Sequence, residues 1–325
     1  MAELKTAAPL MEARNLTKIF NVSRGKLHAV DGVDFKIFPG QTLGVVGESG
    51  CGKSTLGNTI LRLTEPTSGE MYFEGKEYSK VGKREMREMR KDMQMIFQDP
   101  YSSIDPRMCV ADIIAEYMII NRTFKTKREI YAQVEKLMDT VGLAKRLAEA
   151  YPHELDGGRR QRIGVARALS LNPKFIVCDE PVSALDVSIQ AQILNLLMDL
   201  QKELGLTYMF ITHNLSVVKH ISTDIAVMYL GQCVERAPYQ ELFANPRHPY
   251  TKKLLSAIPV PDLSMRNKQI QPIRGEVTSP VNPKPGCRFM SRCEFACEKC
   301  AESMGEPVDF GNRHTCSCIR CTEDL

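Results

Sequence analysis

The hydrophobic positions of the chain fall into short apolar runs separated by longer amphipathic stretches. Apolar runs bounded by helical periodicity are typical of buried parallel strands, because helices cover both faces of such a sheet. Shorter runs of alternating polarity within 10–38, such as 29–35, predict antiparallel strands instead, and 71–73 is a further candidate strand. The buried strands are expected at 43–46, 93–97, 174–179, 206–211 and 225–230.

The amphipathic stretches also indicate how the chain is divided. Residues 81–91 are charged and helical in pattern, and 110–150 show only helical periodicity, so we expect a helical insert at about 105–168. Prolines, cysteines and charges take over near Pro259. The sequence therefore predicts an α/β domain at 1–260, beginning with a flexible leader at 1–9, and a small extension at 261–325.

Composition narrows the class of protein. The 325 residues are 43% hydrophobic and 25% charged with a net charge of +4, which is ordinary for a soluble globular protein and weak evidence for a polyanionic partner. No apolar run is long enough to span a membrane, and the start lacks the apolar core of a signal peptide, so a cytoplasmic location is expected. Seven of the eleven cysteines follow Pro285, a clustering that suggests metal more than disulfides.

A glycine-rich loop between an apolar strand and a helical pattern carries the strongest chemical signal. Its spacing is that of a phosphate-binding loop, in which glycines let backbone N–H groups face phosphate oxygens. Lys53 can reach the β- and γ-phosphates and Ser54 can ligate Mg²⁺, whereas a turn that binds nothing is disfavoured because the flanks agree. The loop consists of Gly47, Glu48, Ser49, Gly50, Cys51, Gly52, Lys53, Ser54 and Thr55.

Two carboxylates follow another apolar strand. Asp179 ends the run 174–179, and Glu180 comes directly after it. Ligand-facing groups of an α/β sheet collect at the carboxyl ends of its strands. Asp179 can hold Mg²⁺ through water, and Glu180 is the better candidate to polarise an attacking water, although acids after a strand can also be merely solvated.

A glycine pair just before the carboxylate strand identifies the family. With the phosphate loop, the segment 155–162 makes the chain resemble the ATP-binding subunits of ABC transporters, whose signature is usually Leu-Ser-Gly-Gly-Gln. Leu155, Gly157 and Gly158 match it, but Asp156 replaces the serine and Arg159 the glutamine. Further matches in order are Phe20 (adenine stacking), Gln98 (Q-loop), 183–186 (D-loop) and His213 (switch histidine). The resemblance covers roughly residues 10–260.

The resemblance implies a fold and a mechanism. The fold is an ABC nucleotide-binding domain with a RecA-like parallel core, an antiparallel β subdomain and a helical subdomain. Two such domains sandwich two ATP molecules head to tail. Each site takes the phosphate loop, Asp179, Glu180 and His213 from one chain, and the signature Asp156, Gly157 and Gly158 from the other. Gln98 joins Glu180 and His213 as a catalytic residue and joins Ser54 as a ligand of Mg²⁺.

Several of these residues also have ordinary structural interpretations. Phe20 can be a core side chain, His213 can cap a helix, and Asp186 can cap the helix expected from residue 187. Asp156 can cap the helix from residue 157, but an ionised aspartate cannot donate a hydrogen bond to a γ-phosphate as serine does. If Arg159 offsets this charge only in part, the dimer has one regular and one altered site.

Three stretches resemble the branch that powers oligopeptide and dipeptide importers. They are 99–107, 245–254 and the cysteine-bearing tail. The amino-acid sequence around the phosphate loop also resembles that of the second of the two paired ATPase subunits in such importers. The implied partners are a non-identical ATPase subunit, two transmembrane permease subunits and, indirectly, an extracytoplasmic binding protein, at the cytoplasmic face of the membrane and without nucleic acid. Nickel-chelate or sugar import and a soluble ABC ATPase remain alternatives; a P-loop kinase is disfavoured by the signature and by the switch histidine.

The tail carries two overlapping metal patterns. Cys287, Cys293, Cys300 and Cys318 match the family's extension, which in related subunits holds a 4Fe–4S cluster. Zinc competes, because Cys297-x-x-Cys300 and Cys318-x-x-Cys321 are separated by 17 residues. Seven reduced thiols are the third possibility. A tail of this size is expected to have little apolar core, so a metal would hold it folded.

Overall fold

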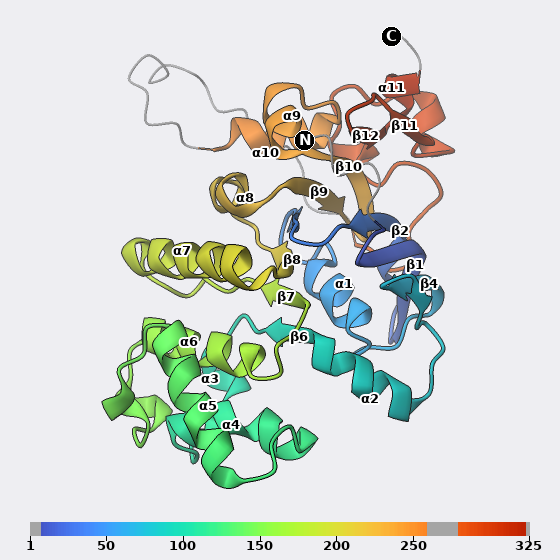
Figure 1. Ribbon diagram of the computed structural model, residues 1–325. Helices are drawn as coiled ribbons and strands as arrows, with labels where there is room; N and C mark the ends of the chain where they lie inside the picture. Colours follow the sequence, from blue (N-terminus) through green and yellow to red (C-terminus); the bar gives the residue numbers. More distant parts are fainter. Residues whose placement is uncertain (1–7, 259–278, 323–325) are drawn as a thin grey trace, which may run out of the picture. The chain divides into compact units, whose positions relative to one another are not determined.

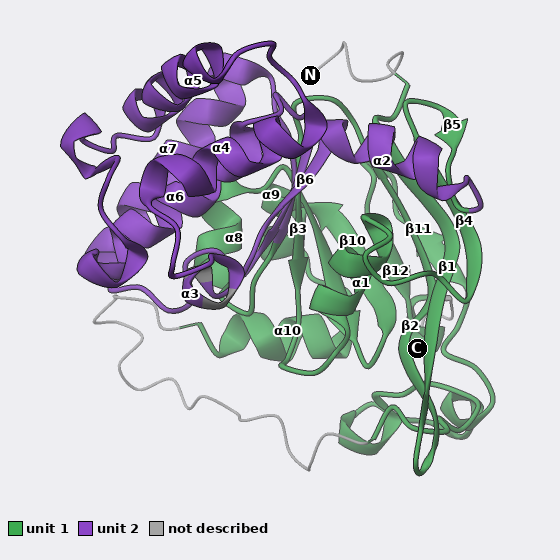
Figure 2. Cartoon of the chain, turned by 90° about the horizontal axis from the view of Figure 1, so that it is seen from below, with its two compact units in different colours: residues 1–79, 211–325 green, residues 80–210 purple. Residues whose placement is uncertain are grey.

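The computed structural model describes residues 8–258 and 279–322 (Figure 1). They form two compact units, coloured separately in Figure 2: unit 1 comprises the described residues of the ranges 1–79 and 211–325, and unit 2 comprises residues 80–210. Most of the predicted leader and the predicted boundary near residue 260 lie outside the described residues. Among the described helices none is long and apolar enough to cross a membrane.

Unit 1 begins with an antiparallel sheet of order β2-β1-β4-β5. Val33, Phe35 and Ile37 of β2 are buried while the intervening Asp34 and Lys36 are exposed, which is the alternation expected of a strand with one face on a core. The antiparallel strands predicted within 10–38 and at 71–73 are therefore confirmed. The strands are β1 (Met11–Val22), β2 (Gly25–Ile37), β4 (Ser68–Phe73) and β5 (Lys76–Glu77).

The second sheet of unit 1 has the order β11-β12-β10-β9-β3. Strands β3 (Thr42–Val46) and β9 (Asp224–Tyr229) pair in parallel and are buried throughout, as predicted from their apolar runs. The later strands pair antiparallel and were not predicted: β10 (Gln232–Pro238), β12 (Thr315–Ser317) and β11 (Pro307–Asp309). The helices are α1 (Lys53–Ile60), α8 (Leu215–Ile221), α9 (Tyr239–Ala244), α10 (Pro249–Ser256) and α11 (Ile319–Thr322).

The cysteine-bearing tail packs into the hydrophobic core of unit 1. Strand β12 pairs with β10, so the tail extends the sheet (Figure 1). Phe289 is 1% exposed and meets the ring of Tyr229 edge to face, with the centroids 5.2 Å apart. The apolar partners of the tail lie in β9 and α10 rather than in the tail itself, so it packs without a separate core of its own.

Unit 2 contains the predicted helical insert and the carboxylate strand. Strands β6 (Met93–Ile96) and β7 (Phe175–Asp179) pair in parallel, and β8 (Thr207–Ile211) is next to β7 in the strand order. These strands and the helical nature of 81–91 and 110–150 are as predicted. The helices are α2 (Lys83–Asp92), α3 (Pro100–Ser103), α4 (Val110–Asn121), α5 (Lys127–Thr140), α6 (Gly157–Leu169) and α7 (Val187–Leu204), with 3₁₀ turns at Lys145–Leu147 and Pro152–Glu154.

Candidate functional site

The backbone of the phosphate loop requires its glycines. Gly47, Gly50 and Gly52 have φ angles of 153°, 77° and 103°, which side chains rarely allow. A Cβ on Gly52 would lie 1.9 Å from the carbonyl oxygen of Ala29, and one on Gly47 would lie 2.2 Å from that of Met228. The loop is thus packed against its neighbours at both ends, and Gly52 forms the N-cap of α1.

Lys53 is the buried cation of this loop. It is 5% exposed, and its Nζ donates hydrogen bonds to the carbonyl oxygens of Gly47 at 2.9 Å and Glu48 at 3.0 Å. The ammonium therefore lies inside the curve of the loop, where the sequence predicted that it would meet phosphate. Ser54 and Thr55 follow in the first turn of α1, while Ser49 precedes Gly50 on the loop's outer part.

Two residues from distant parts of unit 1 hold Glu48. The backbone N–H of Glu48 donates to Tyr250 Oη at 2.9 Å. Arg292 donates from Nη1 and Nη2 to the two carboxylate oxygens of Glu48 at 2.6 and 3.0 Å, and this pairing raises the pKa of Arg292. The sequence motifs do not assign Tyr250 or Arg292 to the phosphate loop. The only sequence signal was their place within two family-like stretches, 245–254 and the segment around Cys293.

The carboxylate site lies in unit 2. Asp179 ends β7 and is 6% exposed. Glu180 adopts a left-handed φ of 44°, an unfavourable conformation for a residue with a side chain and one that clusters at functional sites. Gln98 Nε2 donates to Glu180 Oε2 at 3.2 Å, so the structure brings these two predicted residues together.

The altered signature begins α6. Asp156 is the N-cap, and its carboxylate accepts a hydrogen bond from the backbone N–H of Arg159 at 2.8 Å. The Arg159 side chain approaches the same carboxylate at 3.4 Å. A Cβ on Gly158 would lie 2.7 Å from Ile189, and one on Gly157 would lie 3.0 Å from Leu185. The cap predicted for Asp156 is present, Gly158 packs closely against the first turn of α7, and Gly157 packs against Leu185 just before that helix.

Three further predicted residues are placed singly. Phe20 lies half-buried in β1 with the Lys18 ammonium 4.7 Å from its ring centroid. His213 is exposed in unit 1, before the N-cap residue Asn214 of α8. Asp186 is the N-cap residue of α7, which begins at residue 187 as expected, but its side chain makes no capping hydrogen bond.

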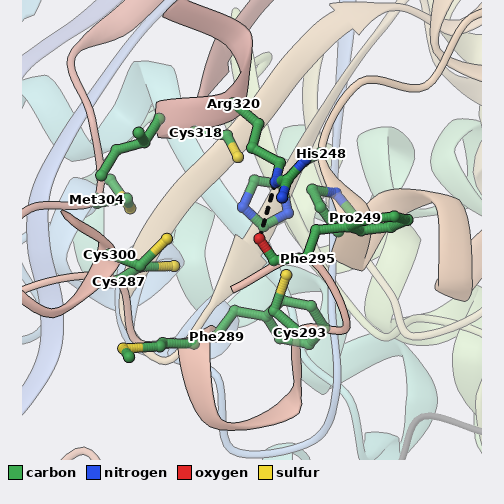
Figure 3. A pocket seen from close by; sticks show the side chains of 12 residues that line it. His248, Pro249, Cys287, Phe289, Cys293, Phe295, Cys300, Met304, Cys318 and Arg320 are labelled. Carbon is green, nitrogen blue, oxygen red and sulfur yellow. Dashed lines mark hydrogen bonds between the residues drawn. The ribbon is translucent and has the colours of Figure 1, made fainter. Parts of the chain in front are cut away.

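The four cysteines of the predicted cluster line one pocket of unit 1. Figure 3 shows their sulfur atoms directed into a common cavity, which has a volume of about 10 Å³. Cys297 and Cys321 of the zinc pattern are not among the lining residues; their sulfurs lie 3.5 Å from Cys300 Sγ and 3.4 Å from Cys316 Sγ. The lining cysteines are Cys287, Cys293, Cys300 and Cys318.

The surroundings of these thiols raise their pKa values. Burial raises the pKa of Cys287 to about 11 and raises the pKa of Cys293. A hydrogen bond with Cys321 raises the pKa of Cys318. Within 8–258 and 279–322, no three His, Cys, Asp or Glu side chains are close enough together to bind one metal ion. The pocket as described is therefore a convergence of thiols rather than a formed single-ion site.

Family models match two regions of the chain. Residues 30–183 match the ABC transporter model, which includes the phosphate loop, the signature and the carboxylates. Residues 234–300 match the model of the oligopeptide/dipeptide transporter C-terminal region, which includes Tyr250, Arg292 and three of the four pocket cysteines.

Curated relatives match nearly the whole chain. The oligopeptide transport ATP-binding protein OppF of Salmonella typhimurium is 49% identical over 322 residues, 96% of each chain. OppF of Bacillus subtilis is 55% identical over 81% of this chain and 86% of its own. The dipeptide transport ATP-binding protein DppF of Haemophilus influenzae is 47% identical over 93% and 94%, respectively.

Solved structures agree with the fold. A dimeric post-hydrolysis state of the ATP-binding cassette MJ0796 bound to ADP and Pi has a TM-score of 0.65 and 28% identity, covering 70% of this chain and 98% of that one. The predicted ABC ATPase fold is thereby confirmed, and ATP and Mg²⁺ follow as its substrate and cofactor. The chain belongs to the ATP-binding proteins of ABC transporters, in the oligopeptide/dipeptide class, and it is an ATPase.

Proposed function

We propose that this chain hydrolyses ATP at the cytoplasmic face of the membrane to power peptide import through a permease. The observation that carries this proposal is the match of residues 234–300 to the oligopeptide/dipeptide C-terminal region, joined to a cassette with an intact phosphate loop. A soluble ABC ATPase has no need of that region. Nickel chelates or sugars remain alternative cargoes, because the subunit itself does not touch cargo.

The test is uptake by cells in which the chromosomal copy is deleted. Labelled di-, tri- and pentapeptides, a nickel chelate and a disaccharide are offered in parallel, and a plasmid-borne copy is the control. Loss of peptide uptake alone, restored by the plasmid, supports the proposal. Normal peptide uptake with loss of nickel or sugar uptake would assign the other cargo, and no transport defect would favour a soluble ATPase.

At the phosphate loop, backbone N–H groups between Gly47 and Ser54 would hold the β- and γ-phosphates, with Lys53 as the cation. Support comes from the left-handed glycines and from the buried ammonium inside the loop. The oxygen donors Ser54, Asp179 and Gln98 suit Mg²⁺, directly or through water, and Mg²⁺ when bound would neutralise phosphate charge. We assign Phe20 to the adenine ring from the family resemblance, and its half-buried ring has the Lys18 ammonium 4.7 Å from its centroid.

At the carboxylates, Glu180 would accept the proton of the attacking water. Its fixed left-handed backbone and its hydrogen bond from Gln98 keep the carboxylate in a single orientation. Gln98 then orients the base, and His213, on the loop after β8, would stabilise the charge that develops on the γ-phosphate. Each assignment rests on the family resemblance together with the placement described above.

The signature is the basis for proposing a non-identical ATPase partner. Asp156, Gly157 and Gly158 would face the ATP held by the partner subunit. The Asp156 carboxylate is occupied as a helix cap and is approached by Arg159, so it offers that ATP no donor. We therefore infer that the site using this chain's Glu180 is regular when the partner carries a serine, whereas the site using Asp156 is slower.

We also propose that Cys287, Cys293, Cys300 and Cys318 hold a 4Fe–4S cluster. Their convergence on one pocket supports it, as does the exclusion of Cys297 and Cys321 from the lining. Zinc needs four sulfurs within about 2.3 Å of a single ion, whereas each cysteine of a cluster binds its own iron.

We propose that the chain consists of a nucleotide-binding domain at 1–260 and a C-terminal extension at 261–325. The contact-based units differ from this division because the tail packs against β9 and α10 and the segment 80–210 is compact by itself. The match to the oligopeptide/dipeptide C-terminal region covers residues 234–300. It therefore begins inside the proposed domain 1–260 and continues into the proposed extension 261–325.

A further inference from the structure

An ion pair joins the tail to the phosphate loop within unit 1. Both terminal nitrogens of Arg292 donate to the carboxylate of Glu48, at 2.6 and 3.0 Å, across 244 positions of sequence. The side chain of Arg292 is 5% exposed and that of Glu48 is 25% exposed. A two-point guanidinium–carboxylate contact fixes the direction of the carboxylate as well as its charge.

The surroundings of Arg292 keep it in place. Its Nη1 also donates to Tyr229 Oη at 3.3 Å, and Tyr250, which accepts the N–H of Glu48, packs on Tyr229 with ring centroids 4.7 Å apart. Phe289 closes the same aromatic cluster. Glu48 is thus held at its backbone by Tyr250 and at its side chain by Arg292, and both contacts rest on buried rings.

The charge of Glu48 explains why such a clamp is needed. A carboxylate within a loop whose amides bind phosphate would repel the nucleotide if its charge were unpaired. The carbonyl oxygen of the same residue accepts a hydrogen bond from Lys53 Nζ at 3.0 Å. A shift of Glu48 would therefore move both an acidic side chain and the anchor of the phosphate-binding cation.

We propose that Arg292 is a positioning residue for ATP binding: it neutralises Glu48 and fixes the phosphate loop in its binding conformation. The extension is then a working part of the nucleotide site. This inference deepens the ATPase activity and does not depend on which cargo is transported or on whether the thiol pocket holds metal.

The test compares binding of Mg·ATP to the full chain by equilibrium titration. Arg292→Gln is expected to raise Kd about tenfold. In the assembled transporter the same variant should raise KM by a similar factor while changing kcat at saturating ATP less than twofold. Arg292→Lys, which keeps the charge but loses the two-point contact, should fall between wild type and Arg292→Gln.

A second variant separates this role from simple loosening of the tail. Adding Glu48→Gln to Arg292→Gln removes the unpaired acid, so the double variant should recover to within about threefold of the wild-type Kd. Arg313→Gln breaks another ion pair of the tail, with Asp224 at 2.9 Å, without touching the loop, and should leave Kd unchanged. If Arg292→Gln alone does not fold, the Kd of the double variant is measured instead and tests the proposal.

Three results would overturn the proposal. The first is an unchanged Kd in folded Arg292→Gln. The second is a double variant that binds as weakly as Arg292→Gln or more weakly. The third is an Arg313→Gln variant that weakens binding as much as Arg292→Gln, which would make any loosening of the tail sufficient.

Discussion

The phosphate loop and the thiol pocket, both in unit 1, are built in different ways. The loop is one contiguous segment whose backbone is set by glycines with left-handed φ angles, and at two of them, Gly47 and Gly52, a Cβ would clash with a neighbouring carbonyl oxygen. The pocket gathers four side chains from separated positions in the tail. A backbone site leaves a contiguous signature in the sequence, whereas a side-chain site leaves only a spacing.

The two regions are not independent of each other. Cys287 and Cys293 line the pocket, while Phe289 and Arg292, between them in sequence, reach the aromatic cluster and the loop. One short segment therefore serves both sites. The comparison teaches that the loop's motif specifies its curve, but residues more than 200 positions away specify how its acidic side chain is held.

The largest effect is expected from a substitution in the phosphate loop itself. Lys53→Ala removes the buried ammonium and should raise the Kd for Mg·ATP about a thousandfold, because a charged partner of the phosphates is lost. Titration of ATP into the purified chain measures it. Lys26→Ala, an exposed lysine of β2, is the matched control and should bind normally. Equal affinity in wild type and Lys53→Ala would remove Lys53 from the site.

The next largest effect is expected where the tail packs against β9 and α10 within unit 1. Phe289→Ala leaves a cavity among Tyr229, Tyr250 and His248, and should lower the free energy of unfolding by about 3 kcal/mol. Urea unfolding of the full chain measures this. Phe310→Ala, at a ring that is 37% exposed, should cost less than about 1 kcal/mol. Similar losses in both variants would show that the tail is not part of the core.

A third experiment distinguishes the two metal patterns. Protein purified anaerobically should be brown and contain about four irons per chain. Cys293→Ser should abolish the iron, whereas Cys321→Ser should spare it; the reverse result, with one zinc in colourless protein, would establish the zinc pattern. Because burial raises the pKa of Cys287 to about 11, loading requires loss of its proton and should improve as the pH of reconstitution rises from 7 to 9. A folded tail with neither metal would contradict both patterns.

The smallest effect concerns the signature. Asp156→Ser keeps a helix cap and supplies a hydroxyl donor, so ATPase activity of the assembled transporter should stay the same or rise by a few-fold. Asp156→Ala removes both the cap and the donor and should lower stability by about 1 kcal/mol without raising activity. A collapse of activity in Asp156→Ser would show that the aspartate is an adapted part of a working site.

Much of the fold could be predicted because its signals are local. The apolar runs at β3, β7, β8 and β9 are long enough to specify buried strands. Glu180 could be chosen because a phosphate loop upstream favours a functional interpretation of carboxylates that follow a strand. Gln98 could be chosen only from the resemblance to the ABC family. The hydrogen bond between Glu180 and Gln98 was not predictable, since it joins residues 82 positions apart through tertiary packing.

The tail could not be predicted in the same way. Strands β11 and β12 are three residues each, too short for any periodicity. They form by pairing rather than from their own propensity, β12 with β10 and β11 with β12. Phe289 and Arg292 are ordinary residues in a proline- and cysteine-rich stretch. Their importance comes from Tyr229 and Glu48, which are distant in sequence, so no window of sequence contains both partners.

The most direct test of the central assignment couples hydrolysis to transport. The chain is reconstituted with its permease and partner ATPase in proteoliposomes, and ATP hydrolysis and labelled-peptide uptake are measured together. Glu180→Gln should leave ATP binding intact and slow hydrolysis about 10²–10⁴-fold, with uptake falling in parallel, because only the proton acceptor is lost. Hydrolysis and uptake at the wild-type rates with Glu180→Gln would contradict the account.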